Sequence, residues 1–218
     1  MSAVPAAALA FLAGYLPGSI PFGLLLVRAA RGTDLRAHGS GNIGATNALR
    51  TAGRGIGIAT LALDVIKGAI GYYAALRVGQ ALGAPWPGFW ATFAPVAGHC
   101  FPVWLRLAGG KGVATALGVL ALAEPRVLGL AALVFFALAV PTRRVSRGSI
   151  GAAATAAVAA FTLPGPGPGG GLDPGLACGI LASTLIVIFR HRSNIGRLLR
   201  GTEPPIGRKA EGLDEDRA

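Results

Sequence analysis

Seven apolar segments separated by short polar connections constrain the fold of this 218-residue chain more than any other feature. They lie near residues 4–27, 56–76, 88–105, 112–123, 127–141, 149–163 and 175–189. Charged residues make up only 13% of the chain, about half the share in a soluble domain. Because a backbone in lipid must satisfy its own hydrogen bonds, such segments predict membrane-spanning helices. The expected fold is all-α: a polytopic membrane helix bundle with about seven transmembrane helices.

The stretch 112–141 is interrupted by Glu124-Pro125-Arg126. Proline lacks an N–H group and disfavours helix in the residue before it, so we expect two helices here. The first of them, 112–123, is shorter than the roughly 20 residues that a span needs. Five spans remain an alternative if this pair of helices is re-entrant.

Basic residues cluster in alternate connections. If the first connection lies inside, the inside segments carry Arg28, Arg31, Arg36, Arg50, Arg54, Arg106, Lys111, Arg143, Arg144, Arg147 and the basic residues from Arg190 onward. The outside connection 164–174 holds a single charged residue, Asp173. This asymmetry predicts an N-terminus outside and a C-terminus in the cytoplasm. The net charge of +11 is then explained by anchoring at the membrane surface, and nucleic acid is not an expected partner.

The domain organisation follows from the same pattern. Residues 1–207 are expected to form one integral membrane domain. Residues 208–218 are expected to form a short, charged, disordered cytoplasmic tail.

The first polar cluster is the run Gly39-Ser40-Gly41-Asn42-Ile43-Gly44-Ala45-Thr46-Asn47, followed by Arg50. Its three closely spaced glycines, Gly39, Gly41 and Gly44, allow successive N–H groups to turn toward an anion. Short side chains that can hydrogen-bond accompany them: Ser40, Asn42, Thr46 and Asn47. Arg50 adds a planar fork suited to phosphate. The run predicts a phosphate-binding loop at a membrane surface, and a glycine-rich turn with a capping threonine is the alternative.

The second cluster is Gly109-Gly110-Lys111-Gly112, which opens an apolar helix. Free N–H groups and a lysine would point at one place there. This is not a Walker loop, because Leu105 stands where the first glycine would be and Gly112 replaces the Ser or Thr. The alternative is that Lys111 only extends to the membrane boundary. For His99, just upstream, we favour a hydrogen-bonded brace over catalysis.

The third cluster, His191-Arg192-Ser193-Asn194, closes the last apolar segment. If the helix continues, His191 and Asn194 share a face. A histidine beside an anion site can transfer a proton or stabilise a developing charge, and a polar end to the span is the alternative. Ser146 and Ser149 lie in a smaller inside loop that can add hydroxyl groups to the same site.

Asp64 and Lys67 are spaced i,i+3 in the second apolar segment. We expect them to pair, because pairing is the least costly way to keep both charges in the membrane.

Acidic residues are few: four of the nine lie in 211–216, and the other five are scattered. A carboxylate cage for magnesium is therefore not expected, and no ligand set for zinc is present. No histidine is followed by an acid in H-x4-D spacing, and no G-x-S-x-G elbow occurs. The predicted site handles phosphate groups without a metal or any other cofactor.

Three runs, GSGNIGATNALRTAG, AGHCFPVWLRLAGGKGVAT and HRSNIGRLLRGTE, occur in this order between apolar segments. Together they resemble the three cytoplasmic motifs of the PlsY family of acyl-phosphate:glycerol-3-phosphate acyltransferases. LALDVIKG in the second apolar segment also resembles this family, and the similarity covers residues 8–207. The departures are the Pro-Gly-rich insert at 164–174 and the tail beyond 208, and neither touches a motif.

The resemblance implies transfer of a fatty acyl group from acyl phosphate to the sn-1 hydroxyl of glycerol 3-phosphate. The products would be lysophosphatidate and phosphate, in the first acylation step of phospholipid synthesis. The implied setting is a bacterial plasma or inner membrane, with the active site on the cytoplasmic side. The implied partners are glycerol 3-phosphate, acyl phosphate and membrane lipid. A functional link to the enzyme that makes acyl phosphate is also implied. By motif position, the functional residues are Ser40, Arg50, Lys111, His191 and Asn194.

These inferences combine into one site hypothesis. Ser40, Arg50 and His191 are the predicted catalytic residues. The predicted substrate-binding residues are Gly39, Gly41, Asn42, Gly44, Thr46, Asn47, Lys111, Ser149 and Asn194. The general base stays open between His191 and the phosphate of the donor. The acyl chain is expected to lie between helices, open to the bilayer.

A transporter of a phosphate-bearing metabolite would share cationic loops and broken helices. The placement of every polar cluster on one side, and the lack of an inverted internal repeat, disfavour it. A membrane scaffold would leave the glycine loop unexplained.

Overall fold

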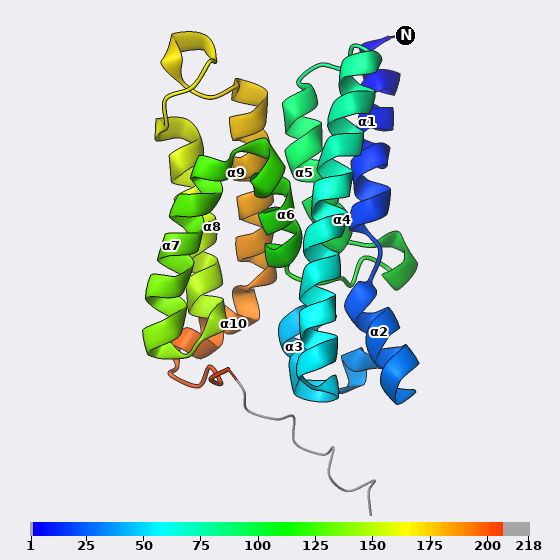
Figure 1. Cartoon of the computed structure of the whole chain (residues 1–218), viewed down its shortest axis with the longest axis vertical. Coiled ribbons are helices and arrows are strands. Elements are labelled where there is room, and N and C mark those ends of the chain that lie inside the picture. Colours follow the sequence, from blue (N-terminus) through cyan, green and yellow to red (C-terminus); the bar gives the residue numbers. More distant parts are fainter. Residues whose placement is uncertain (1, 207–218) are drawn as a thin grey trace, which may run out of the picture.

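The computed structural model describes residues 2–206, and every regular element in this part of the chain is helical (Figure 1). The α-helices are α1 (Ala3–Gly18), α2 (Phe22–Arg31), α3 (Ala45–Ala52), α4 (Arg54–Ala81), α5 (Pro87–Cys100), α6 (Val113–Ala123), α7 (Pro125–Thr142), α8 (Val145–Thr162), α9 (Pro174–Arg190) and α10 (Arg192–Leu199). Short 3-10 turns occur at η1 (Leu35–Ala37), η2 (Val103–Leu105) and η3 (Pro168–Gly170). The predicted all-α fold is confirmed. The predicted tail, 208–218, lies outside the described residues.

The long helices form two groups that lie side by side (Figure 1). Helices α1, α4 and α5 pack against one another, and α7 and α8 pack together with α9. Contacts of α5 with α9, and of α6 with α4, join the two groups. The short helices α2, α3 and α10 lie together at one end of the bundle. The first and third polar clusters of the sequence therefore lie at the same end of the bundle, on α3 and α10.

Three helical segments of residues 2–206 are long and apolar enough to cross a membrane: Ala3–Arg31, Arg54–Ala81 and Pro125–Thr142. Helices α9 and α10, bent by 57°, would make a fourth if they form one broken span. Each of the seven predicted segments contains a helix, but α5 has 14 residues and α6 only 11. The number of seven spans therefore stays a prediction.

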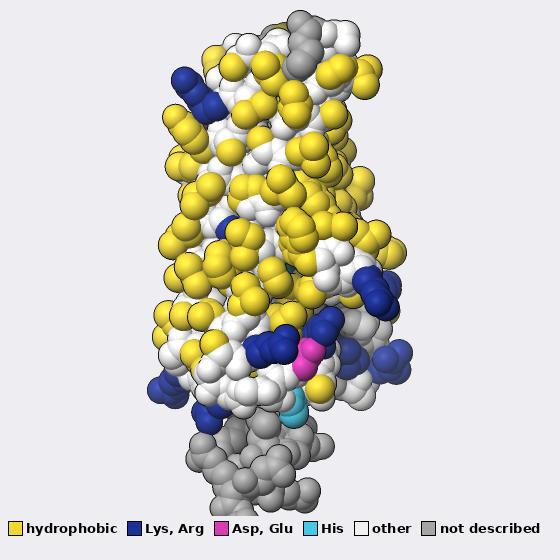
Figure 2. Space-filling view, turned by 90° about the vertical axis from the view of Figure 1, so that its right-hand side faces the viewer, with side chains coloured by type: hydrophobic (Ala, Val, Ile, Leu, Met, Phe, Trp, Pro, Cys, Tyr) yellow, Lys and Arg dark blue, Asp and Glu magenta, His cyan; other side chains and the backbone are white. Residues whose placement is uncertain are grey.

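Hydrophobic and basic side chains are distributed over the surface of the bundle as expected for a protein in a membrane. On the face shown in Figure 2, hydrophobic side chains cover most of the length, and most Lys and Arg side chains gather toward one end. Exposed residues along the helices include Ile58, Ile66, Leu133 and Phe136. Lipid would cover such side chains.

The break between α6 and α7 lies where the sequence predicts it, since Glu124 leaves helical geometry with φ −159° and ψ 85°. The first apolar segment, 4–27, is also divided, and this break was not predicted. Helix α1 ends at Gly18 and α2 begins at Phe22, because Pro21 cannot donate the hydrogen bond that would continue the helix.

Two polar side chains, one buried on α4 and one exposed on η2, hold the break between α1 and α2. Lys67 Nζ donates to the carbonyl oxygen of Ile20 at 2.6 Å, and Trp104 Nε1 donates to that of Ser19 at 3.0 Å. Lys67 also pairs with Asp64 at 2.7 Å, which confirms the predicted pairing. The pair therefore also satisfies a carbonyl group that the broken helix leaves free within the membrane region.

Glycine allows the helices to approach one another closely. A Cβ atom at Gly118 would overlap the carbonyl oxygen of Val65, so α6 lies directly on the backbone of α4. A Cβ atom at Gly18 would likewise overlap the backbone of Pro95 on α5. Such small-residue contacts drive helix association in lipid.

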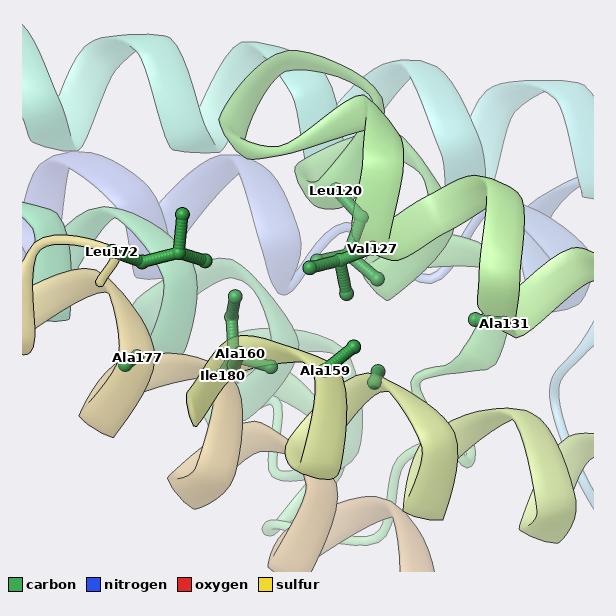
Figure 3. Packing of buried hydrophobic residues seen from close by; sticks show 9 residues of the cluster. Leu120, Val127, Ala131, Ala159, Ala160, Leu172, Ala177 and Ile180 are labelled. Carbon is green, nitrogen blue, oxygen red and sulfur yellow. The ribbon is translucent and has the colours of Figure 1, made fainter. Parts of the chain in front are cut away.

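The second group of helices is joined by a small apolar core (Figure 3). Leu120 of α6 and Val127 of α7 point toward Ala159 and Ala160 of α8, and Ile180 comes from α9. The small alanine side chains at the centre of this core allow α8 to lie close to α9.

Candidate active site

The glycine loop lies between η1 and α3 and is built around Asn47. The N–H group of Ser40 donates to Asn47 Oδ1 at 3.0 Å. Asn47 Nδ2 lies within 3.1 Å of three carbonyl oxygens, those of Leu35, His38 and Asn42. The side chain is 2% exposed. The loop therefore uses both ends of this amide. Asn47 was expected to contact the substrate, but its side chain instead supports the loop from within.

The rest of the loop presents backbone and hydroxyl groups. Gly39 and Gly41 have φ values of +58° and +67°, a conformation that favours glycine. Asn42 Oδ1 accepts from the N–H group of Gly44 at 3.0 Å, where α3 begins. The side chain of Ser40 is exposed, and Thr46 lies in the first turn of α3. The first-turn N–H groups of a helix favour an anion.

Arg50 lies in the last turn of α3 and reaches the C-terminal end of the described chain. Its Nη2 donates to the carbonyl oxygen of Pro205 at 3.4 Å, and its buried Nε has no partner among residues 2–206. Burial lowers the pKa of Arg50, Glu203 opposes this effect and Arg197 adds to it. An arginine remains charged in proteins, so an unused guanidinium N–H is available to an anionic oxygen.

Glu203, which the sequence did not mark as a site residue, lies buried among residues of the candidate site. Its carboxylate is 7% exposed, and Oε1 accepts from Ser146 Oγ at 2.6 Å and from Asn194 Nδ2 at 2.7 Å. Oε2 accepts from Arg197 Nε at 2.7 Å. Burial acts to raise the pKa of Glu203, but these hydrogen bonds outweigh it and the pKa is lowered. The sequence could have pointed to Glu203, since it is the one acidic residue in the basic stretch 174–210.

The backbone around Glu203 is held as firmly as its side chain. Arg144 Nε donates to the carbonyl oxygen of Glu203 at 3.0 Å. The N–H group of Ile206 donates to the carbonyl oxygen of Arg143 at 2.7 Å. The segment 200–206 therefore folds back against the start of α8, which brings it within reach of Arg50.

Lys111 lies among the charges of the first and third clusters. Burial lowers its pKa to about 8, with Glu203 opposing the change and Arg197, Arg50 and Arg190 adding to it. Charges influence a pKa strongly only at short range, so Lys111 shares one region with them. Cations outnumber the single carboxylate, and the region is positively charged.

His191 lies at the bend between α9 and α10 and is 2% exposed. Its Nδ1 is 2.8 Å from the carbonyl oxygen of Val187. Because a carbonyl can only accept, we place the hydrogen on Nδ1, which leaves Nε2 as an acceptor in the neutral ring. Burial lowers the pKa of His191 to about 4, so the ring is neutral at pH 7.

Asn194 and Ser149 complete the predicted set. Asn194 donates to Glu203 through Nδ2, while its buried Oδ1 has no partner among the described residues. Ser149 is buried on α8, three residues after Ser146. His99, in contrast, lies in the packed interior with Nδ1 3.7 Å from Asp64 Oδ1, and this nitrogen has no hydrogen-bond partner among residues 2–206. The hydrogen-bonded brace expected at His99 therefore stays a prediction.

The structure thus relates four of the predicted residues to Glu203: Asn194 donates a hydrogen bond to its carboxylate, and its charge acts on the pKa values of Arg50, Lys111 and His191. The glycine loop, with Ser40, is joined to this group through α3, which begins at the loop and carries Arg50 in its last turn. Among residues 2–206, no three His, Cys, Asp or Glu side chains gather as metal ligands would. The arrangement can bind phosphate groups through cations and can orient a hydroxyl group through His191 Nε2 and Asn194 Oδ1.

Residues 8–201 match the family model described as glycerol-3-phosphate acyltransferase. A glycerol-3-phosphate acyltransferase of Mesorhizobium japonicum is 45% identical over 201 residues, which are 92% of this chain and 96% of that protein. One of Myxococcus xanthus is 47% identical over 193 residues, with 88% and 95% covered.

Two crystal structures of PlsY (YgiH), an integral membrane glycerol 3-phosphate acyltransferase, are similar to the structure of this chain. The glycerol 3-phosphate form has a TM-score of 0.79 and 36% identity, and covers 92% of this chain and 96% of its own. The lysophosphatidic acid form has a TM-score of 0.77 and 35% identity, with 93% and 96% covered. The chain belongs to the PlsY family of integral membrane glycerol-3-phosphate acyltransferases.

Proposed function

We propose that this protein transfers a fatty acyl group from acyl phosphate to the sn-1 hydroxyl of glycerol 3-phosphate. The observation that carries the proposal is the gathering of Arg50, Lys111 and Arg197 in one region with two acceptors, His191 Nε2 and Asn194 Oδ1, that no donor of residues 2–206 uses. Both substrates bring a phosphate, and one brings the hydroxyl group that must be oriented. The acyltransferase names of the relatives support the acceptor substrate.

The reaction needs no covalent enzyme intermediate, because an acyl phosphate is a mixed anhydride and already activated. The sn-1 oxygen attacks the acyl carbon, the bond from that carbon to the phosphate oxygen breaks, and inorganic phosphate leaves. Holding the two substrates in this geometry supplies much of the rate. N–H groups and cations aimed at the carbonyl oxygen and the departing phosphate stabilise the charge that develops there.

Each cluster has a proposed task. Arg50 and Lys111 bind the phosphate of glycerol 3-phosphate, and His191 with Asn194 accepts hydrogen bonds from its hydroxyl groups. The glycine loop, with Ser40 and the first turn of α3, binds the head of the acyl phosphate. Membrane lipid surrounds the acyl chain, which lies between helices.

The proton of the attacking hydroxyl goes to a phosphate oxygen of the donor. His191 can accept a hydrogen bond through Nε2, but its pKa of about 4 makes it a weak proton acceptor at neutral pH. A phosphate monoester-like group has a second pKa of about 6, so the leaving phosphate holds the proton better. His191 then orients the hydroxyl group, and Ser40 assists at the donor.

The setting we propose is a bacterial plasma or inner membrane, with seven spans and the N-terminus outside. The end of the bundle that carries α2, α3 and α10 (Figure 1) would face the cytoplasm. Acyl phosphate would come from the enzyme that makes it, to which this protein is functionally linked.

The donor can be tested with purified protein. We expect palmitoyl phosphate and glycerol 3-phosphate to give lysophosphatidate without added metal and in the presence of EDTA, because the site binds phosphate through cations of the chain. Product formation is measured by mass spectrometry. Activity with acyl-CoA alone, or loss of activity with EDTA, would contradict the proposal. Uptake of glycerol 3-phosphate into vesicles without acylation would favour a transporter.

Arg50→Ala and Lys111→Ala should each lower kcat/KM for glycerol 3-phosphate by at least about tenfold, since a charge-assisted hydrogen bond contributes about 1.5–3 kcal/mol. Arg50→Lys should recover only part of the loss, because a point charge cannot replace the planar fork. Arg77→Ala, which removes a cation stacked on Tyr73 of α4, is the control and should match the wild type. Wild-type kinetics in all the variants would show that these cations only anchor the protein.

Topology is tested with single cysteines introduced at Gly83, Pro168, Asp34 and Val145 of a protein in which Cys100 and Cys178 are replaced by serine. The alternation of basic connections predicts that residues 83 and 168 react with an impermeant thiol reagent added outside intact cells. Residues 34 and 145 should react only after the membrane is opened. Labelling of residue 168 from the cytoplasmic side would overturn the seven-span model.

A further inference from the structure

Arg190, the last residue of α9, directly precedes His191 but points toward a different part of the chain. Its Nε donates to the carbonyl oxygen of Gly110 at 2.9 Å, and its Nη2 donates to that of Gly109. The guanidinium also lies over the ring of Phe101, with 5.6 Å between Cζ and the ring centroid. One side chain therefore joins the end of α9 to the turn that carries Lys111.

The other side of the same turn is held by α5. The N–H group of Gly109 donates to the carbonyl oxygen of Cys100 at 3.2 Å, and the N–H group of Gly110 donates to the carbonyl oxygen of His99 at 3.0 Å. A Cβ atom at Gly110 would overlap the imidazole of His99, so the turn lies flat against the helix. Both glycines of the turn are buried, and buried carbonyl groups need a donor. Arg190 supplies that donor.

We propose that Arg190 is a positioning residue that sets the place of Lys111 relative to His191. The inference rests on the proposed function, in which Lys111 binds the acceptor phosphate and His191 orients the acceptor hydroxyl. A lysine side chain is flexible, so the place of its ammonium depends on a fixed backbone. Arg190 fixes that backbone from the residue next to His191, and a planar fork fits two adjacent carbonyl oxygens better than a point charge does. The distance between the two substrate-binding groups is thereby set.

Kinetics with a double-mutant cycle distinguish positioning from general stabilisation. Arg190→Gln should raise KM for glycerol 3-phosphate at least about fivefold while kcat stays within about twofold. If Arg190 acts through Lys111, the double variant with Lys111→Ala should have the kcat/KM of Lys111→Ala within about twofold, because coupled sites are not additive. Arg190→Lys, which retains one donor, should be intermediate. Fully additive losses, or an unchanged KM in Arg190→Gln, would overturn the proposal.

Arg192→Gln is the matched control. Arg192 is exposed, and its guanidinium stacks on Phe189 of α9 at 4.7 Å, without a contact to the Gly109–Gly110 turn in the described chain. It should have wild-type KM and kcat.

A measurement without catalysis tests the placement itself. In a Cys178→Ser background, Lys111→Cys is labelled with a charged methanethiosulfonate, and the protein that keeps Lys111 gives the background from buried Cys100. Arg190→Gln should speed labelling of residue 111 at least about fivefold, and Arg190→Lys by less. An unchanged rate in both variants overturns the inference. Faster labelling of residue 111, together with no acyl transfer by the wild-type protein, would instead retain the placement by Arg190 and reject the proposed function.

Discussion

The rest of the candidate site depends on the hydrogen bonds and ion pair that surround the buried carboxylate of Glu203. A charge taken out of water is costly unless it is paired and hydrogen-bonded, and here three donors from α8 and α10 surround it: Ser146, Asn194 and Arg197. The same carboxylate offsets the mutual repulsion of Arg50, Lys111 and Arg197. Because the cations still outnumber it, the region keeps the positive charge that the two phosphate-bearing substrates of the proposed reaction require.

The membrane portion of the bundle makes this gathering possible. Glycine contacts such as Gly118 on Val65 keep the long helices close, so their ends converge. The break after α1 lets α2 and α3 lie at that same end, and Lys67 satisfies the carbonyl group of Ile20 that the break leaves free. A buried pair within the membrane is therefore part of the scaffold that presents the glycine loop.

Much of this could be predicted from the sequence, because apolar segments, Pro125 and the i,i+3 spacing of Asp64 and Lys67 act through local rules. The break between α1 and α2 follows a local rule too, at Pro21, but the donors that satisfy its free carbonyl groups could not be predicted, because Lys67 and Trp104 lie far along the chain. The same holds for Asn47, whose amide is used by carbonyl groups that only the folded loop brings together. Glu203 looked like an isolated acid because its partner Ser146 is 57 residues away, and only the reversal of the chain at 200–206 unites them.

The most direct test of this account is to replace Glu203 with glutamine and to measure both thermal unfolding in detergent and glycerol 3-phosphate affinity by calorimetry. A neutral amide cannot accept all three hydrogen bonds or offset the cations, so the account predicts a lower Tm together with weaker binding. Glu124→Gln removes a carboxylate that pairs with Arg126 between α6 and α7, and it should leave the affinity unchanged. Wild-type Tm and wild-type affinity in the Glu203→Gln protein would contradict the account.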